Sequence, residues 1–88
     1  MDYTNHMVDV LAITPEEIAE KLRGAGFRHV KTNSVVTQTG SIVTHASVHV
    51  PGVTVEAAQV MISTVLTGDS VKITRDPQNQ QIHIHPIK

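Results

Sequence analysis

The chain has 88 residues, a net charge of −1 with its histidines neutral, and no cysteine. This length is enough for one domain and too short for two, so we treat residues 1–88 as a single domain. The absence of cysteine excludes a disulfide framework, a thiolate metal site and a cysteine nucleophile. The charge balance does not indicate nucleic-acid binding through bulk positive charge.

Aliphatic side chains must build the core, because aromatic residues make up only 2% of the sequence. Residues 1–6 are predicted to be a loose N-terminus. The longest apolar stretch, Met7 to Ile13, is interrupted by Asp9 and is too short to span a bilayer. No signal peptide is visible, so we expect a cytoplasmic protein without a membrane partner.

The N-terminal third predicts a strand followed by a helix. Met7–Ile13 is apolar with little alternation, which is typical of a strand covered on both faces. The sequence Thr14-Pro15-Glu16-Glu17 matches a capping box with proline at the first helical position. Apolar residues then recur at helical spacing, which predicts a helix over residues 15–25.

The middle of the chain predicts a hairpin and a second helix. The β-branched runs His29–Thr37 and Ile42–Val50 flank a turn around Gly40, as in a β-hairpin. Thr54 is placed to cap a helix over residues 55–67. Because this helix is the more apolar of the two, we expect it to be the more buried, with Met61 filling the core.

The last part of the chain predicts two further strands, Val71–Arg75 and Ile82–Ile87, joined by a turn over residues 76–80. Pro86 cannot donate a ladder hydrogen bond, which favours an edge position for the final strand. The fold class is therefore α+β. We expect a two-layer, ferredoxin-like βαββαβ sandwich with an extra C-terminal edge strand and both helices on one face of a mostly antiparallel sheet.

Alternation along the strands assigns side chains to the two faces of this sheet. The face against the helices is expected to carry Val30, Val36, Ile42, Ala46, Val48, Val50, Val71, Ile73, Ile82 and Ile84. The opposite, open face is expected to carry His29, Lys31, His45, His49, Lys72, His83 and His85. Five of the six histidines of the chain thus share one surface.

Four interpretations of this surface stay open. It is a solvated face, a contact surface for a protein partner or a second copy, a metal site, or a platform for single-stranded nucleic acid. The metal interpretation uses His45, His49, His83 and His85, since imidazole is the commonest metal ligand. The predicted strand order separates the first pair from the second, which argues against one shared ion. The nucleic-acid interpretation lacks aromatic side chains on which bases stack.

Catalytic motifs are not found: the sequence has no glycine-rich phosphate loop and no nucleophile elbow. We therefore assign no catalytic residue and no cofactor. The leading hypothesis is a small non-enzymatic binding or assembly domain, such as an accessory factor, an inhibitor or a subunit, that uses its histidine-rich face or an edge strand. The alternatives are a histidine-based divalent-metal module or small hydrolase, and, third, a single-stranded nucleic-acid binder.

Overall fold

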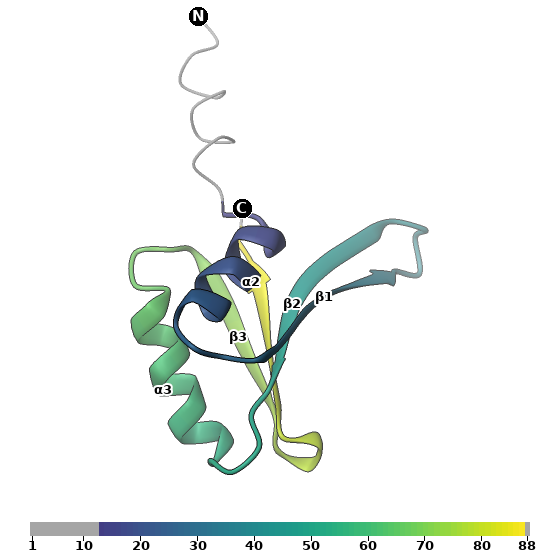
Figure 1. The fold of residues 1–88 in the computed structure, drawn as a ribbon. Coiled ribbons are helices and arrows are strands. Elements are labelled where there is room, and N and C mark those ends of the chain that lie inside the picture. The colour runs from purple at the N-terminus through teal and green to yellow at the C-terminus, as the bar shows by residue number, and fades with distance from the viewer. Residues whose placement is uncertain (1–12, 88) are drawn as a thin grey trace, which may run out of the picture.

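The computed structural model describes residues 13–87. Figure 1 shows their arrangement, in which two helices lie against a four-stranded sheet. In chain order the elements are α2 (Pro15–Gly24), β1 (His29–Val36), β2 (Ile42–His49), α3 (Val55–Val65), β3 (Val71–Asp76), the short 3-10 helix η1 (Pro77–Asn79) and β4 (Gln81–Pro86).

The predicted N-terminal strand, Asp9 and the loose terminus over 1–6 lie outside the described residues. Ile13 is described, and it belongs to no strand. Its side chain is buried with the core. No helix of the described part is long and apolar enough to cross a membrane.

Helix α2 begins as its sequence predicts. The Thr14 hydroxyl accepts the backbone N–H of Glu17 at 3.2 Å, and the Glu17 carboxylate accepts the backbone N–H of Thr14 at 3.1 Å. The two bonds satisfy N–H groups that a helix start leaves without internal partners. The helix ends at Gly24, and Gly26 follows with a φ of +102°, which only glycine adopts without strain. The predicted helix over residues 15–25 is confirmed to within one residue.

The sheet has the order β1-β2-β4-β3, and every neighbouring pair is antiparallel. The α+β class, with two helices and a four-stranded antiparallel sheet, is confirmed. The ferredoxin-like order is not. A βαββαβ sheet keeps the second hairpin strand apart from the last strands, whereas here β2 pairs directly with β4.

Strand β4 lies inside the sheet, so the prediction of a C-terminal edge strand is wrong. The inference rested on Pro86, which cannot donate a ladder hydrogen bond. However, the β2–β4 ladder runs only from Ala46↔Ile84 to His49↔Gln81, and Pro86 lies beyond it. Since no bond from Pro86 to β2 is required, the proline is compatible with an interior strand.

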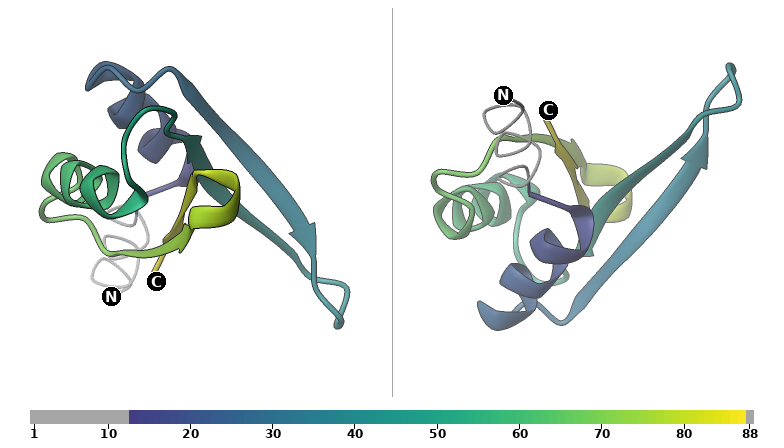
Figure 2. Two further views of the ribbon diagram at one scale, coloured as in Figure 1. Left: turned by 90° about the horizontal axis from the view of Figure 1, so that it is seen from below. Right: turned by 90° about the horizontal axis from the view of Figure 1, so that it is seen from above.

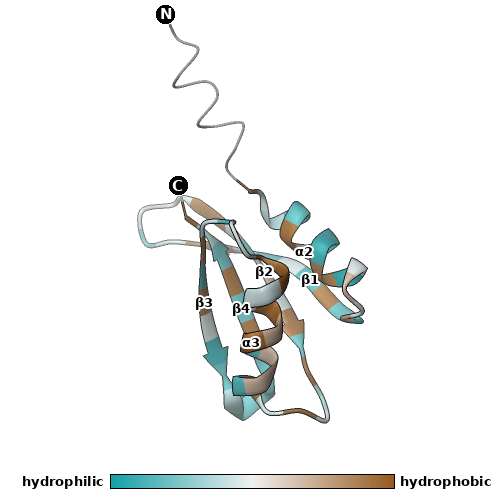
Figure 3. Cartoon of the chain, turned by 90° about the vertical axis from the view of Figure 1, so that its left-hand side faces the viewer, coloured by the Kyte–Doolittle hydropathy of each residue, from teal (hydrophilic) through white to brown (hydrophobic). Residues whose placement is uncertain are grey.

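Both helices cover the same face of the sheet, with α2 packed chiefly on β1 and β2 and α3 on β3 and β4. The alternation of apolar and polar residues along the strands is visible in Figure 3. Among the described residues, the hydrophobic core consists of Ile13, Ile18, Ala19, Leu22, Val30, Ala46, Val48, Val50, Val55, Ala58, Ile62, Leu66, Ile82 and Ile84. The strand residues in this set are those that alternation assigns to the helix side.

Two predictions about apolar side chains are wrong. Met61 is exposed instead of filling the core, and so is its neighbour Val60. The buried stripe of α3 and its C-cap consists of Val55, Ala58, Ile62 and Leu66. Val60 and Met61 lie off this stripe and are therefore exposed. Helix α3 is therefore no more buried than α2.

The far end of the β1–β2 hairpin projects beyond both helices, as both views of Figure 2 show. For this reason Val36 and Ile42, expected beneath the helices, are exposed. They are cross-strand partners, and β2 has no β4 neighbour at this level because the β2–β4 ladder starts at Ala46. The direction of each side chain was predicted correctly, but the helices do not reach that far.

Replacing Ile84 with alanine tests the position of the core. Ile84 is 0% exposed, so Ile84→Ala removes fully buried methyl groups and should lower the free energy of unfolding by about 2–5 kcal/mol. Ile42 has the same side chain and lies on the same side of the sheet, but it is 71% exposed. In urea denaturation of dilute, monomeric protein, Ile42→Ala should therefore cost about 0.5 kcal/mol or less. Equal losses in the two variants would contradict this placement of the core.

Candidate functional site

The side of the sheet away from the helices carries all seven residues predicted for it: His29, Lys31, His45, His49, Lys72, His83 and His85. Strand register aligns them across the sheet. His29 is opposite His49, Ser47 is opposite both Lys31 and His83, and Lys72 is opposite His85. We call these seven residues the histidine face.

His45 contacts two other members of the histidine face, and we call His45, His83 and His85 the histidine cluster. Nε2 of His45 lies 3.2 Å from Nδ1 of His83, within hydrogen-bond distance. The rings of His45 and His85 are stacked, with centroids 4.7 Å apart and an interplanar angle of 27°. The rings of His45 and His83 meet edge to face at 5.2 Å.

The pairing of β2 with β4 creates this cluster. Ala46 is opposite Ile84, so His45 lies one position further along, beside His85. His83 is diagonal to His45, on the same face, and faces Ser47. Diagonal neighbours on one face of an antiparallel pair remain within reach of aromatic rings. The expectation that His45 is far from the last strands is therefore wrong.

His49 belongs to a different group. It makes an edge-to-face contact with His29, with ring centroids 5.8 Å apart. This contact lies where β1 begins and β2 ends. The four histidines suggested as a metal set, His45, His49, His83 and His85, are thus divided between two contacts. Within residues 13–87, no three or more His, Cys, Asp or Glu side chains form an arrangement that could hold a metal ion as it stands.

Ser47 lies between the two groups and was not predicted as a site residue. It is buried although it faces away from the helices, and its hydroxyl accepts a hydrogen bond from Nδ2 of Asn33 at 2.7 Å. A small side chain among larger ones leaves a hollow of about 270 Å³, which is lined by His29, Val30, Lys31, Ser47, His49 and Gln81. Alternation could have placed Asn33 and Ser47 on this face, but it could not have shown that they bond.

Burial and neighbouring charge act on the histidine cluster together. His45 is only 9% exposed. Its pKa is lowered first by desolvation and then by the charges of His85 and His83. The pKa of His85 is also lowered, by desolvation, by His83 and by Lys72. Both effects favour the neutral imidazole, the form that can accept a hydrogen bond.

Asp76 is the acid that sequence reasoning placed only in a turn. It ends β3 on the histidine side, opposite Gln81. A side-chain hydrogen bond from Asn79, at 2.8 Å, is the main cause of its lowered pKa, to which the charge of His83 also contributes. It therefore provides negative charge near one end of the histidine face, while Lys72 provides positive charge near the other.

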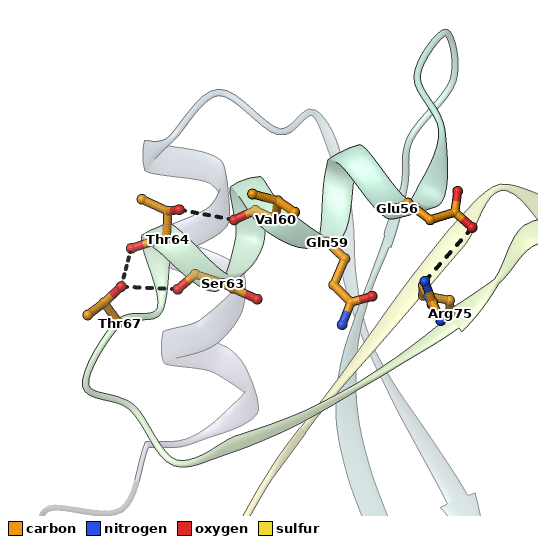
Figure 4. A pocket seen from close by; sticks show the side chains of 7 residues that line it. All are labelled: Glu56, Gln59, Val60, Ser63, Thr64, Thr67 and Arg75. Atoms are coloured by element: carbon orange, nitrogen blue, oxygen red, sulfur yellow. Dashed lines mark hydrogen bonds and ion pairs between the residues drawn. The ribbon is translucent and has the colours of Figure 1, made fainter.

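A second hollow, of about 540 Å³, lies along the outer side of α3 and is drawn in Figure 4. Its threonine hydroxyls and its charged side chains interact with the protein itself. The hydroxyl of Thr64 donates to the carbonyl of Val60 at 3.0 Å, and Arg75 lies 3.8 Å from Glu56. Hydroxyls that bond to their own helix are not directed at a ligand. We therefore place the candidate site on the histidine face.

The lowered pKa values predict a pH-dependent stability. In the folded protein the pKa values of His45 and His85 lie below 6.5, the ordinary pKa of histidine. Their contribution to the free energy of unfolding is complete above pH 6.5 and is lost as pH falls below it. The reason is that these histidines bind protons at a higher pH in the unfolded chain than in the folded protein. Urea midpoints should be constant from about pH 8.5 to 7.5 and fall between about pH 6.5 and 5. His45→Gln should reduce the fall, and a midpoint that is equal at both ends of the range would contradict the prediction.

No family model, curated protein or solved structure matches the chain. The features that bear on function are therefore physical ones: the histidine face, its cluster of three rings, and the projecting hairpin beside it.

Proposed function

We propose that this chain is a non-enzymatic assembly domain that associates with a second copy of itself through the free edge of β1. The exposed end of the β1–β2 hairpin carries this proposal. Val35, Val36, Ile42 and Val43 are all exposed there, and we call these four residues the hairpin arm. They form two cross-strand pairs, Val35↔Val43 and Val36↔Ile42, one on each face of the ribbon.

The hairpin arm is a formed ribbon rather than an irregular loop. The backbone N–H of Thr37 donates to the carbonyl of Ser41 at 2.8 Å, and the side chains of Ser34 and Thr44 bond across the strands at 3.0 Å. A ribbon whose strands are already paired loses less conformational entropy on binding than an irregular loop does, which favours association. Its four aliphatic side chains gain from leaving water at about 25 cal/mol per Å² of buried apolar area.

Among residues 13–87, strand β1 is at the edge of the sheet, and no other described strand pairs with its outer row of backbone groups. In natural proteins, charged residues or proline on an edge strand prevent it from pairing with another chain. From Thr32 to Thr44 this chain has neither Asp, Glu, Lys, Arg nor Pro. The beginning of the edge is capped by Arg23, whose guanidinium donates to the carbonyl of Val30 at 3.0 Å.

A second copy is the partner that fits such an edge. Two antiparallel β1 strands related by a two-fold axis present the same surface to each other, which is the commonest symmetry of soluble oligomers. The uncharged segment requires no complementary charge on the partner. Because this axis is perpendicular to the sheet, the two histidine faces would lie on the same side and form one continuous surface.

The native mass, measured by light scattering after size-exclusion chromatography, tests the proposal. The chain should be a dimer, and Val36→Lys should make it monomeric by placing a charge on the hairpin arm. Val60→Lys is the matched control, because Val60 is 67% exposed and Val36 is 69% exposed, and Val60 lies on α3. This control should remain dimeric.

A wild-type chain that is monomeric at its highest soluble concentration would contradict self-association. A dimer that Val60→Lys disrupts and Val36→Lys does not would place the interface on α3 instead. Circular dichroism of both variants would verify that each is folded.

A further inference from the structure

We propose that the histidine cluster binds one divalent transition-metal ion of the zinc type, with Nε2 of His45 and Nδ1 of His83 as ligands. Both ligands come from one chain, so the inference does not depend on the dimer. It rests on the strand order, which puts the two rings side by side on β2 and β4.

The spacing of the two nitrogen atoms is that of a chelate. Zinc binds imidazole nitrogen at about 2.0–2.1 Å with tetrahedral angles, so two nitrogen ligands of one ion are about 3.3 Å apart. Nε2 of His45 and Nδ1 of His83 are 3.2 Å apart. The strand register and the side-chain conformations therefore hold the two nitrogen atoms at the required separation.

Binding requires the rings to turn but not to move apart. The two nitrogens now share a hydrogen bond, in which one N–H points toward the other nitrogen. For both lone pairs to meet at one ion, each ring must tilt by about 35° from the line between the nitrogens, by tetrahedral geometry. The donor ring also changes tautomer, and its proton moves to the other ring nitrogen, so no net proton is released.

His85 positions the first ligand. Its ring stacks on that of His45, and His45 is almost fully buried, which restricts the orientations its imidazole can take. Ligands held in this way lose less rotamer freedom when they bind.

The charges around the cluster are balanced. Lys72 is opposite His85 and disfavours a cation at that end, whereas Asp76 lies toward His83 and favours one. The ion should therefore lie on the His83 side of His45. The chain supplies two ligands, so water would complete the tetrahedral coordination.

Isothermal titration of the untagged protein with zinc chloride, at about pH 7.5 where unperturbed histidine is neutral, tests the inference. The wild type should bind one ion per chain. His45→Gln and His83→Gln should each weaken binding by more than about tenfold, because each removes a direct ligand. The second variant changes a less buried side chain, so it remains informative if the first fails to fold.

The double variant His29→Gln/His49→Gln is the matched control. It removes two histidines from the same face and leaves the cluster intact, so it should bind zinc as the wild type does. Histidine ring NMR should show zinc-dependent shifts at His45 and His83. Absence of stoichiometric binding, or an equal loss in the control, would overturn the inference whatever the native mass shows.

Discussion

Hydrogen bonding between β2 and β4 is the interaction on which the rest of this structure depends. It joins two hairpins, each of which would be marginally stable alone, into one four-stranded sheet. On the helix side, the same pairing places Ala46 beside Ile84 and completes the aliphatic layer beneath α2 and α3. On the other side, it brings His45 to His83. The β2–β4 pairing thus positions both the core, on one face of the sheet, and the candidate site, on the other.

The shortness of that ladder also explains the exposed end of the molecule. Only Ala46 to His49 of β2 pair with β4, so β1 is the one described strand that pairs with the preceding residues, Ile42 to His45. The helices do not extend over this region, and its valines and isoleucine remain in solvent. A protein that keeps an uncharged, apolar ribbon beside an open edge has a surface suited to pairing with another strand.

Histidine chemistry on the opposite face follows from the same packing. Three imidazoles held within ring contact shield one another from water and repel one another when charged. Lys72 adds to this effect at His85. A neutral imidazole nitrogen accepts either a proton or a metal ion, and the two compete for it.

Local chemistry in the sequence determined both helices, both hairpins and the face to which each strand side chain points. The Thr14–Glu17 cap and the two-residue period of the strands depend only on neighbours in the chain. Membership of the histidine face could therefore be predicted residue by residue. The period says nothing about which strands are adjacent or how far the helices reach. Only the tertiary structure decided that β4 pairs with β2, that His83 rather than His49 meets His45, and that Ile42 is exposed, because these depend on long-range pairing between strands of similar local preference.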